Sequence, residues 1–164
     1  MCSAALALPG EGCVEQVCLK CGTAFYNNAK PCAGAFVVRN GQVMLVRRGI
    51  EPYKHYWDIP GGFLSPDEHP ETGAAREVRE ETGLNIRITN LVGIFVDTYG
   101  EGSSEYTLNI YYRAEVVDGV PEPRSDAVEI GWFDWNRLPE KIAFDHARSA
   151  LQQWAAIEQG GHST

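Results

Sequence analysis

Short apolar runs separated by turn residues dominate the first half of the chain and predict strands. Residues 33–39 (AGAFVVR) and 43–48 (VMLVRR) are apolar and rich in β-branched residues, as strands are. Asn40-Gly41 between them is a favoured two-residue hairpin turn, so the two runs are expected to pair. Residues 49–61 (GIEPYKHYWDIPG) carry two prolines and are expected to form a loop.

The following segment has the pattern of a helix. Residues 70–82 (PETGAAREVREET) are mostly good helix formers, Pro70 suits the first turn, and Gly83 suits the position after the last turn. Gly73 lies inside this helix, where glycine costs about 1 kcal/mol relative to alanine. A close approach of another segment is therefore expected at Gly73.

The second half of the chain alternates again between strands and one helix. Residues 86–96 and 106–117 are rich in β-branched and aromatic residues, and the polar segment 97–105 separates them. A short strand is expected at 128–132, and a terminal helix with one apolar face at 144–158. This mixture of strands and helices predicts the α/β fold class, in layers.

The first 30 residues differ from the rest, because they are rich in glycine, cysteine and polar residues. They are expected to form an arm ahead of a domain at 31–164. Four cysteines lie in the arm: Cys2, Cys13, Cys18 and Cys21. Four thiolates could close a tetrahedral zinc site, but the spacing is irregular and only one Cys-x-x-Cys pair is present. Free thiols are the preferred interpretation, and zinc is the alternative.

Composition and charge then narrow the classes of function. The chain has 164 residues with 22 acidic and 14 basic side chains, a net charge of −8. This balance argues against nucleic-acid binding, which needs clustered lysine and arginine. No apolar run approaches the roughly 18 residues that cross a bilayer, and no basic residue precedes the short apolar stretch near the N-terminus. A cytoplasmic protein with reduced thiols and no membrane partner is expected.

Half of the net charge falls within residues 62–84, which hold six acidic and two basic residues, a balance of −4. Glu77, Glu80 and Glu81 are spaced i, i+3 and i+4 on the predicted helix and so share one face. Three like charges there repel one another, and a hard cation such as Mg²⁺ would relieve the repulsion. The alternative is a solvated acidic face paired with arginines such as Arg76.

The same stretch resembles the Nudix box, G-x5-E-x7-R-E-U-x-E-E-x-G-U, where U is aliphatic. Every constrained position is matched, by Gly62, Glu68, Arg76, Glu77, Val78, Glu80, Glu81, Gly83 and Leu84. The resemblance covers residues 31–158 and implies the Nudix fold, an α/β/α sandwich with a mixed central β-sheet. The arm resembles a degenerate form of the zinc ribbon that some Nudix proteins carry.

The resemblance implies a Mg²⁺-dependent pyrophosphohydrolase, with Mn²⁺ as a substitute, acting on a nucleoside diphosphate linked to another moiety. The metal ligands that it implies are Gly62, through its carbonyl, and Glu77, Glu80 and Glu81. Glu68 and Arg76 would be structural. The residues expected to be catalytic are Glu77, Glu80 and Glu129, the last being preferred over Glu101 and Glu105 as a base from a later loop.

The substrate must also meet basic and aromatic side chains. Arg47 and Arg48 end a strand, and because strand side chains alternate, only one of them should face the cleft. The sequence leaves open which one. Trp57, Tyr99 and Phe144 are candidates for stacking on a base.

The resemblance favours ADP-ribose or a related nucleotide sugar as the substrate. NADH or another dinucleotide, and non-standard nucleoside triphosphates, are the alternatives. A non-catalytic nucleotide sensor is a different class of function, and it is disfavoured because every glutamate of the box is present. The sequence leaves the oligomeric state open, and a homodimer is one candidate because Nudix relatives are commonly homodimers.

Overall fold

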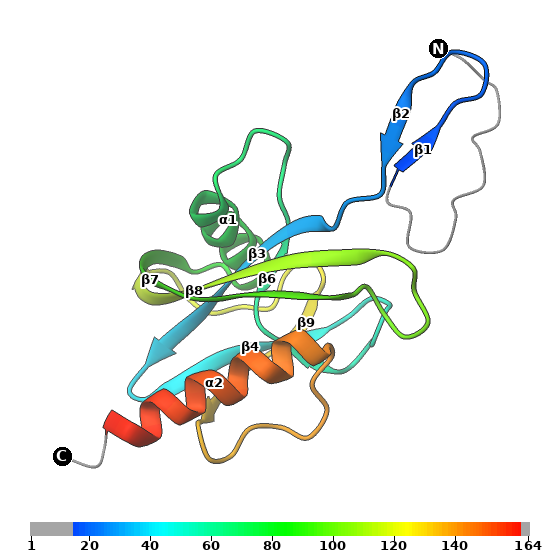
Figure 1. The fold of residues 1–164 in the computed structure, drawn as a ribbon. Helices are drawn as coiled ribbons and strands as arrows, with labels where there is room; N and C mark the ends of the chain where they lie inside the picture. Colours follow the sequence, from blue (N-terminus) through cyan, green and yellow to red (C-terminus); the bar gives the residue numbers. More distant parts are fainter. Residues whose placement is uncertain (1–14, 162–164) are drawn as a thin grey trace.

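Seven strands form one mixed sheet in the computed structural model, which describes residues 15–161 (Figure 1). The strands are β3 (Lys30–Arg39), β4 (Gln42–Arg48), β5 (Trp57–Asp58), β6 (Gly61–Phe63), β7 (Asn85–Thr98), β8 (Tyr106–Asp118) and β9 (Ala127–Asp134), and the helices are α1 (Pro70–Thr82) and α2 (Asp145–Gly161). The sheet order is β5-β4-β3-β8-β7, with β6 paired to β3 and β9 to β4. β3 and β8 run parallel, and the other pairs are antiparallel.

The two helices cover opposite faces of this sheet (Figure 1). Alternation along β3 explains why: Ala35 and Val37 pack with Val78 of α1, whereas Phe36 packs with Trp154 of α2. All of these side chains are buried. The α/β class and the sandwich with a mixed central sheet are confirmed.

The predicted hairpin and helix are present where the sequence placed them. Asn40 and Gly41 both have positive φ, 52° and 78°, as a two-residue hairpin turn requires. Gly83 ends α1 in the left-handed conformation, with φ 73°. Gly73 faces a neighbouring segment as expected, because a Cβ at that position would clash with the Leu64 side chain and lie 3.0 Å from a Glu68 oxygen.

The expectation of a loop at 49–61 was wrong in part. Residues 57–58 form β5, and β6 begins at Gly61. Strands of two or three residues are too short to show periodicity in a sequence. Pairing of β5 with β4 and of β6 with β3 holds these residues extended.

The arm contributes a separate two-stranded sheet, β1 (Glu15–Val17) and β2 (Ala24–Tyr26). The turn between them carries Cys18, which is buried, and Cys21, whose Sγ lies 3.3 Å from Thr23 Oγ1. Cys2 and Cys13 lie outside the described residues, so zinc binding by the arm stays a prediction. Across residues 15–161, no helix is long and apolar enough to cross a membrane.

Gly61→Ala is expected to lower the free energy of unfolding by about 2 kcal/mol, as overpacking does. A Cβ at Gly61 would lie 2.6 Å from Ala33 O and 2.6 Å from Gly34 Cα, both backbone atoms that cannot move aside alone. Urea unfolding measures the change. Gly102→Ala is the control, because the space around Gly102 is open and only its positive φ adds a cost. Equal stability of Gly61→Ala and the wild type would contradict this packing.

Candidate active site

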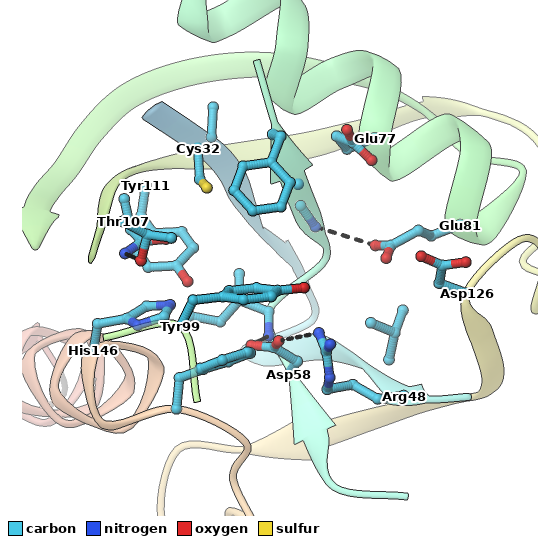
Figure 2. A pocket seen from close by; sticks show the side chains of 18 of the residues that line it. Cys32, Arg48, Asp58, Glu77, Glu81, Tyr99, Thr107, Tyr111, Asp126 and His146 are labelled. Carbon is cyan, nitrogen blue, oxygen red and sulfur yellow. Dashed lines mark hydrogen bonds and ion pairs between the residues drawn. The ribbon is translucent and has the colours of Figure 1, made fainter. Parts of the chain in front are cut away.

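A cavity of about 380 Å³ opens where α1, β3 and β6 meet the start of α2 (Figure 2). One end carries the carboxylates of Glu77, Glu81 and Asp126, and the other end carries Tyr111 and His146. Two glutamates of the acidic helix therefore face a hollow large enough for part of a small molecule.

Glu77 is held against the Gly-Gly segment that precedes the helix. Its side chain is only 16% exposed, and a Cβ at Gly62 would lie 2.6 Å from Glu77 Oε1. Only glycine leaves room for this carboxylate. Burial raises the pKa of Glu77 above its usual value, although the hydrogen bond from Arg76 acts in the opposite direction.

Glu81 lies deeper in the same end of the cavity. Its Oε2 accepts a hydrogen bond of 3.1 Å from the Gly61 N–H. Burial raises the pKa of Glu81 well above its usual value, and repulsion from Asp58 adds to the shift. A bound cation would stabilise the charged form of Glu81 and so lower this pKa.

The side chains at this end of the cavity have the chemistry of the metal site that the box implies. Glu77 and Glu81 offer hard carboxylate oxygens, which suit Mg²⁺ or Mn²⁺. Within the described part of the chain, no three His, Cys, Asp or Glu side chains converge closely enough to form a ready-made metal cage. Mg²⁺ ordinarily takes one or two carboxylates and completes its shell with water and substrate phosphates, so the donor set fits.

Arg76 fixes the position of Glu77. Its Nε and Nη2 donate to the two oxygens of Glu68, both at 2.8 Å, and its Nη1 donates to Glu77 Oε1 at 2.8 Å and to Glu80 Oε2 at 3.1 Å. The hydrogen bonds from Arg76 lower the pKa of Glu68 to about 2. Glu80 is exposed and does not line the cavity.

Arg76→Lys is expected to lower the free energy of unfolding by about 2 kcal/mol, because an ammonium group cannot replace a bidentate fork and charged hydrogen bonds contribute about that much each. Urea unfolding measures the loss. Arg79→Lys is the matched control, since Arg79 is exposed on the same helix. A loss at Arg76 no larger than at Arg79 would contradict the positioning role.

Of the two arginines that end β4, Arg48 lines the cavity and Arg47 does not. Arg48 Nη1 lies 3.2 Å from Asp58 Oδ2, and its Nε donates to Pro52 O at 2.8 Å. Arg47 instead pairs with Glu129 at 3.0 Å on an exposed part of the surface. The alternation of side chains along β4 thus places Arg48 on the side of the cavity.

The other candidates separate in the same way. Glu129 is half exposed in its pair with Arg47, and it lies outside the cavity lining. Trp57 also lies outside the lining and packs edge-on against Phe133, with ring centroids 4.9 Å apart. Tyr99 and Phe144 line the cavity.

The comparison with known proteins decides what this arrangement is. A family model described as the NUDIX domain matches residues 29–153. The chain belongs to the Nudix family. It is a Nudix hydrolase, and the cavity beside its box helix is the candidate active site of that enzyme.

Its relatives and structural neighbours agree with this assignment. The "ADP-ribose pyrophosphatase" of Methanocaldococcus jannaschii is 31% identical over 112 residues, which cover 68% of this chain and 65% of that protein. The "MutT-like protein" of Streptomyces ambofaciens is 32% identical over 111 residues, which cover 68% of this chain and 67% of that protein. The crystal structure of a Nudix hydrolase from Nitrosomonas europaea superposes with a TM-score of 0.80 at 27% identity, covering 98% of this chain and 93% of that chain. The chain thus spans about two thirds of the length of these two curated relatives.

One acidic residue of the cavity was not among the residues predicted from the sequence. Asp126 lines the cavity, and Figure 2 shows its carboxylate at the same end as that of Glu81. Two backbone bonds hold this loop in place: Arg124 N–H donates to Glu81 O at 2.8 Å, and Gly49 N–H donates to Asp126 O at 2.7 Å. The sequence does show that Asp126 is an acidic residue directly before β9. The residue predicted from the sequence was instead Glu129, which lies inside that strand.

Proposed function

We propose that this Nudix hydrolase cleaves the pyrophosphate group of a nucleoside diphosphate linked to another moiety, with Mg²⁺ or Mn²⁺ as the required ion. The observation that carries the proposal is the pair Glu77 and Glu81, two largely buried carboxylates with raised pKa values that face one cavity. Groups perturbed in this way by burial and like charge are typical of functional sites.

The reaction needs neutralisation of phosphate charge and a positioned water. Bound Mg²⁺ supplies both, by screening phosphate oxygens and lowering the pKa of its water. In the proposal Glu77 and Glu81 hold the ion, and Arg76 keeps Glu77 oriented through its 2.8 Å bond. Arg48, which lines the same cavity, binds a phosphate oxygen.

Asp126 is the proposed proton acceptor for the attacking water. Its place in the cavity lining favours it over Glu129, which is tied to Arg47 outside that lining. A positioned carboxylate of this kind typically contributes 10²–10⁴-fold to the rate, an order-of-magnitude range for general bases.

ADP-ribose or a related nucleotide sugar is the proposed substrate class. The support is a relative named ADP-ribose pyrophosphatase that is 31% identical to this chain. A dinucleotide such as NADH and a non-standard nucleoside triphosphate are the other candidates.

A panel of these substrates with Mg²⁺ tests the proposal, with the products identified by chromatography. ADP-ribose is expected to give AMP and ribose 5-phosphate. AMP with a nicotinamide mononucleotide would instead assign a dinucleotide, and a monophosphate with inorganic pyrophosphate would assign a triphosphate. Binding of ADP-ribose with every substrate left intact would show a nucleotide sensor and overturn the proposed hydrolysis.

A further inference from the structure

The end of the cavity away from the glutamates has a distinct set of side chains (Figure 2). Strand β8 contributes Thr107, Asn109 and Tyr111. These residues are spaced two apart, so their side chains lie on the same face of the strand. Asn109 and Tyr111 line the cavity although each is only 5% exposed, so both belong to the interior of the domain.

Two polar groups at this end have no hydrogen-bond partner among residues 15–161. Asn109 Nδ2 donates to Thr107 Oγ1 at 2.9 Å, which leaves Asn109 Oδ1 as an unused acceptor. Among residues 15–161, no hydrogen bond reaches that oxygen or the Tyr111 hydroxyl. In this range, Trp154 Nε1 is the only side-chain polar atom that is both fully enclosed and without a partner. Asn109 Oδ1 and the Tyr111 hydroxyl are therefore not fully enclosed, and they are open to the cavity that both residues line. Both groups are therefore available to hydrogen-bond to a molecule in the cavity.

The two groups differ in hydrogen-bonding character. Burial raises the pKa of Tyr111 well above its usual value, with repulsion from Asp58 as the next cause, so its hydroxyl stays protonated and can donate. Asn109 Oδ1 can only accept. A donor therefore lies two residues from an acceptor on the same face of β8.

Flat aromatic rings line this same end. Tyr99 and Phe144 are stacked with centroids 5.9 Å apart, and Phe144 and His146 with centroids 5.0 Å apart. The His146 ring is fixed because its Nδ1 lies 3.1 Å from Asp97 Oδ2, which also accepts from the His146 backbone N–H at 3.0 Å. An uncharged planar ring suits such surroundings, and a phosphate does not.

We propose that this end of the cavity seats the nucleobase of the substrate, with Asn109 as the residue that determines base specificity. Asn109 Oδ1 accepts from an amino group or ring N–H of the base, and the Tyr111 hydroxyl donates to the neighbouring ring nitrogen or carbonyl. The adenine edge offers such a pair, an amino group beside a ring nitrogen. The inference rests on the proposed function, because it is the pyrophosphate at the glutamates that brings a base to this end.

Equilibrium binding of AMP, GMP, CMP, UMP and base-free ribose 5-phosphate to the full chain, in Mg²⁺, tests the inference. The wild type is expected to bind its preferred monophosphate at least about 10-fold more tightly than ribose 5-phosphate, and Asn109→Leu to reduce that gain to less than about 3-fold, as the loss of a hydrogen bond would. Binding of ribose 5-phosphate should not change. Asn90→Leu, at an exposed asparagine of β7, is the matched control and should retain the gain.

A preference among bases that Asn109→Leu leaves intact would overturn the inference, as would a wild type that binds AMP and the other monophosphates no more tightly than ribose 5-phosphate. A measurement on the wild type covers the case in which Asn109→Leu does not fold. Titration of the preferred monophosphate should shift the NMR signals of the Asn109 side-chain amide, and shifts confined to other regions would equally reject it. Because none of these readouts requires turnover, failure of hydrolysis in the substrate panel is distinguishable from failure of the base site.

Discussion

Glu81→Gln is expected to abolish Mg²⁺-dependent hydrolysis, with kcat reduced by at least about 1,000-fold, since an ion that polarises phosphate and water contributes several kcal/mol. The amide keeps the oxygen that accepts from the Gly61 N–H, so the local geometry is retained. What is lost is the charge that holds the cation. Steady-state kinetics in saturating Mg²⁺ measures the change.

The stability of Glu81→Gln provides the control for folding. Because burial raises the pKa of Glu81 above its unfolded value of about 4.5, the folded protein binds more protons than the unfolded chain just above that pH. In the metal-free wild type, the contribution of Glu81 to the free energy of unfolding therefore falls as the pH rises from 4.5 through the raised pKa. Glu81→Gln has no ionisable group at this position and does not show this fall. Urea unfolding without metal at several pH values is expected to show the variant at least as stable at neutral pH. Full activity of a folded Glu81→Gln protein would contradict its role as a metal ligand, and Glu71→Gln, at an exposed position of the same helix, should retain activity.

Asp126→Asn is expected to lower kcat by about 100-fold, the lower end of what a general base contributes. KM should change little, because the proton is transferred only in the transition state. Substitution at Glu129 is the comparison: a large loss in Glu129→Gln with none in Asp126→Asn would reinstate Glu129 as the base.

The box and the fold were readable from the sequence because they depend on local patterns. Asn40-Gly41 and Gly83 mark backbone positions with positive φ, and the structure has the turn and the helix end there. In the apolar runs beside these positions, successive side chains pack on opposite faces of the sheet. The spacing of Glu77 and Glu81 on one helical face likewise needs no tertiary information.

The remainder of the site depends on contacts between distant segments. Strand alternation required that Arg47 and Arg48 diverge, but only the pairing of β4 with β5 and β9 determines that Arg48 faces the cavity. Asp126 is brought to Glu81 by backbone bonds across the chain, which leave no periodic signal. Asn109 is an ordinary polar residue inside an apolar strand until β8 is placed beside the cavity.

The rate of ADP-ribose hydrolysis as a function of Mg²⁺ concentration, starting from protein stripped with a chelator, tests the central claim most directly. No turnover is expected without the ion, and a saturable rise on its addition, with AMP and ribose 5-phosphate released in equal amounts. Turnover that persists without any divalent ion, or a substrate that stays intact at saturating Mg²⁺, would contradict the assignment of Glu77 and Glu81 to a metal-dependent pyrophosphohydrolase site.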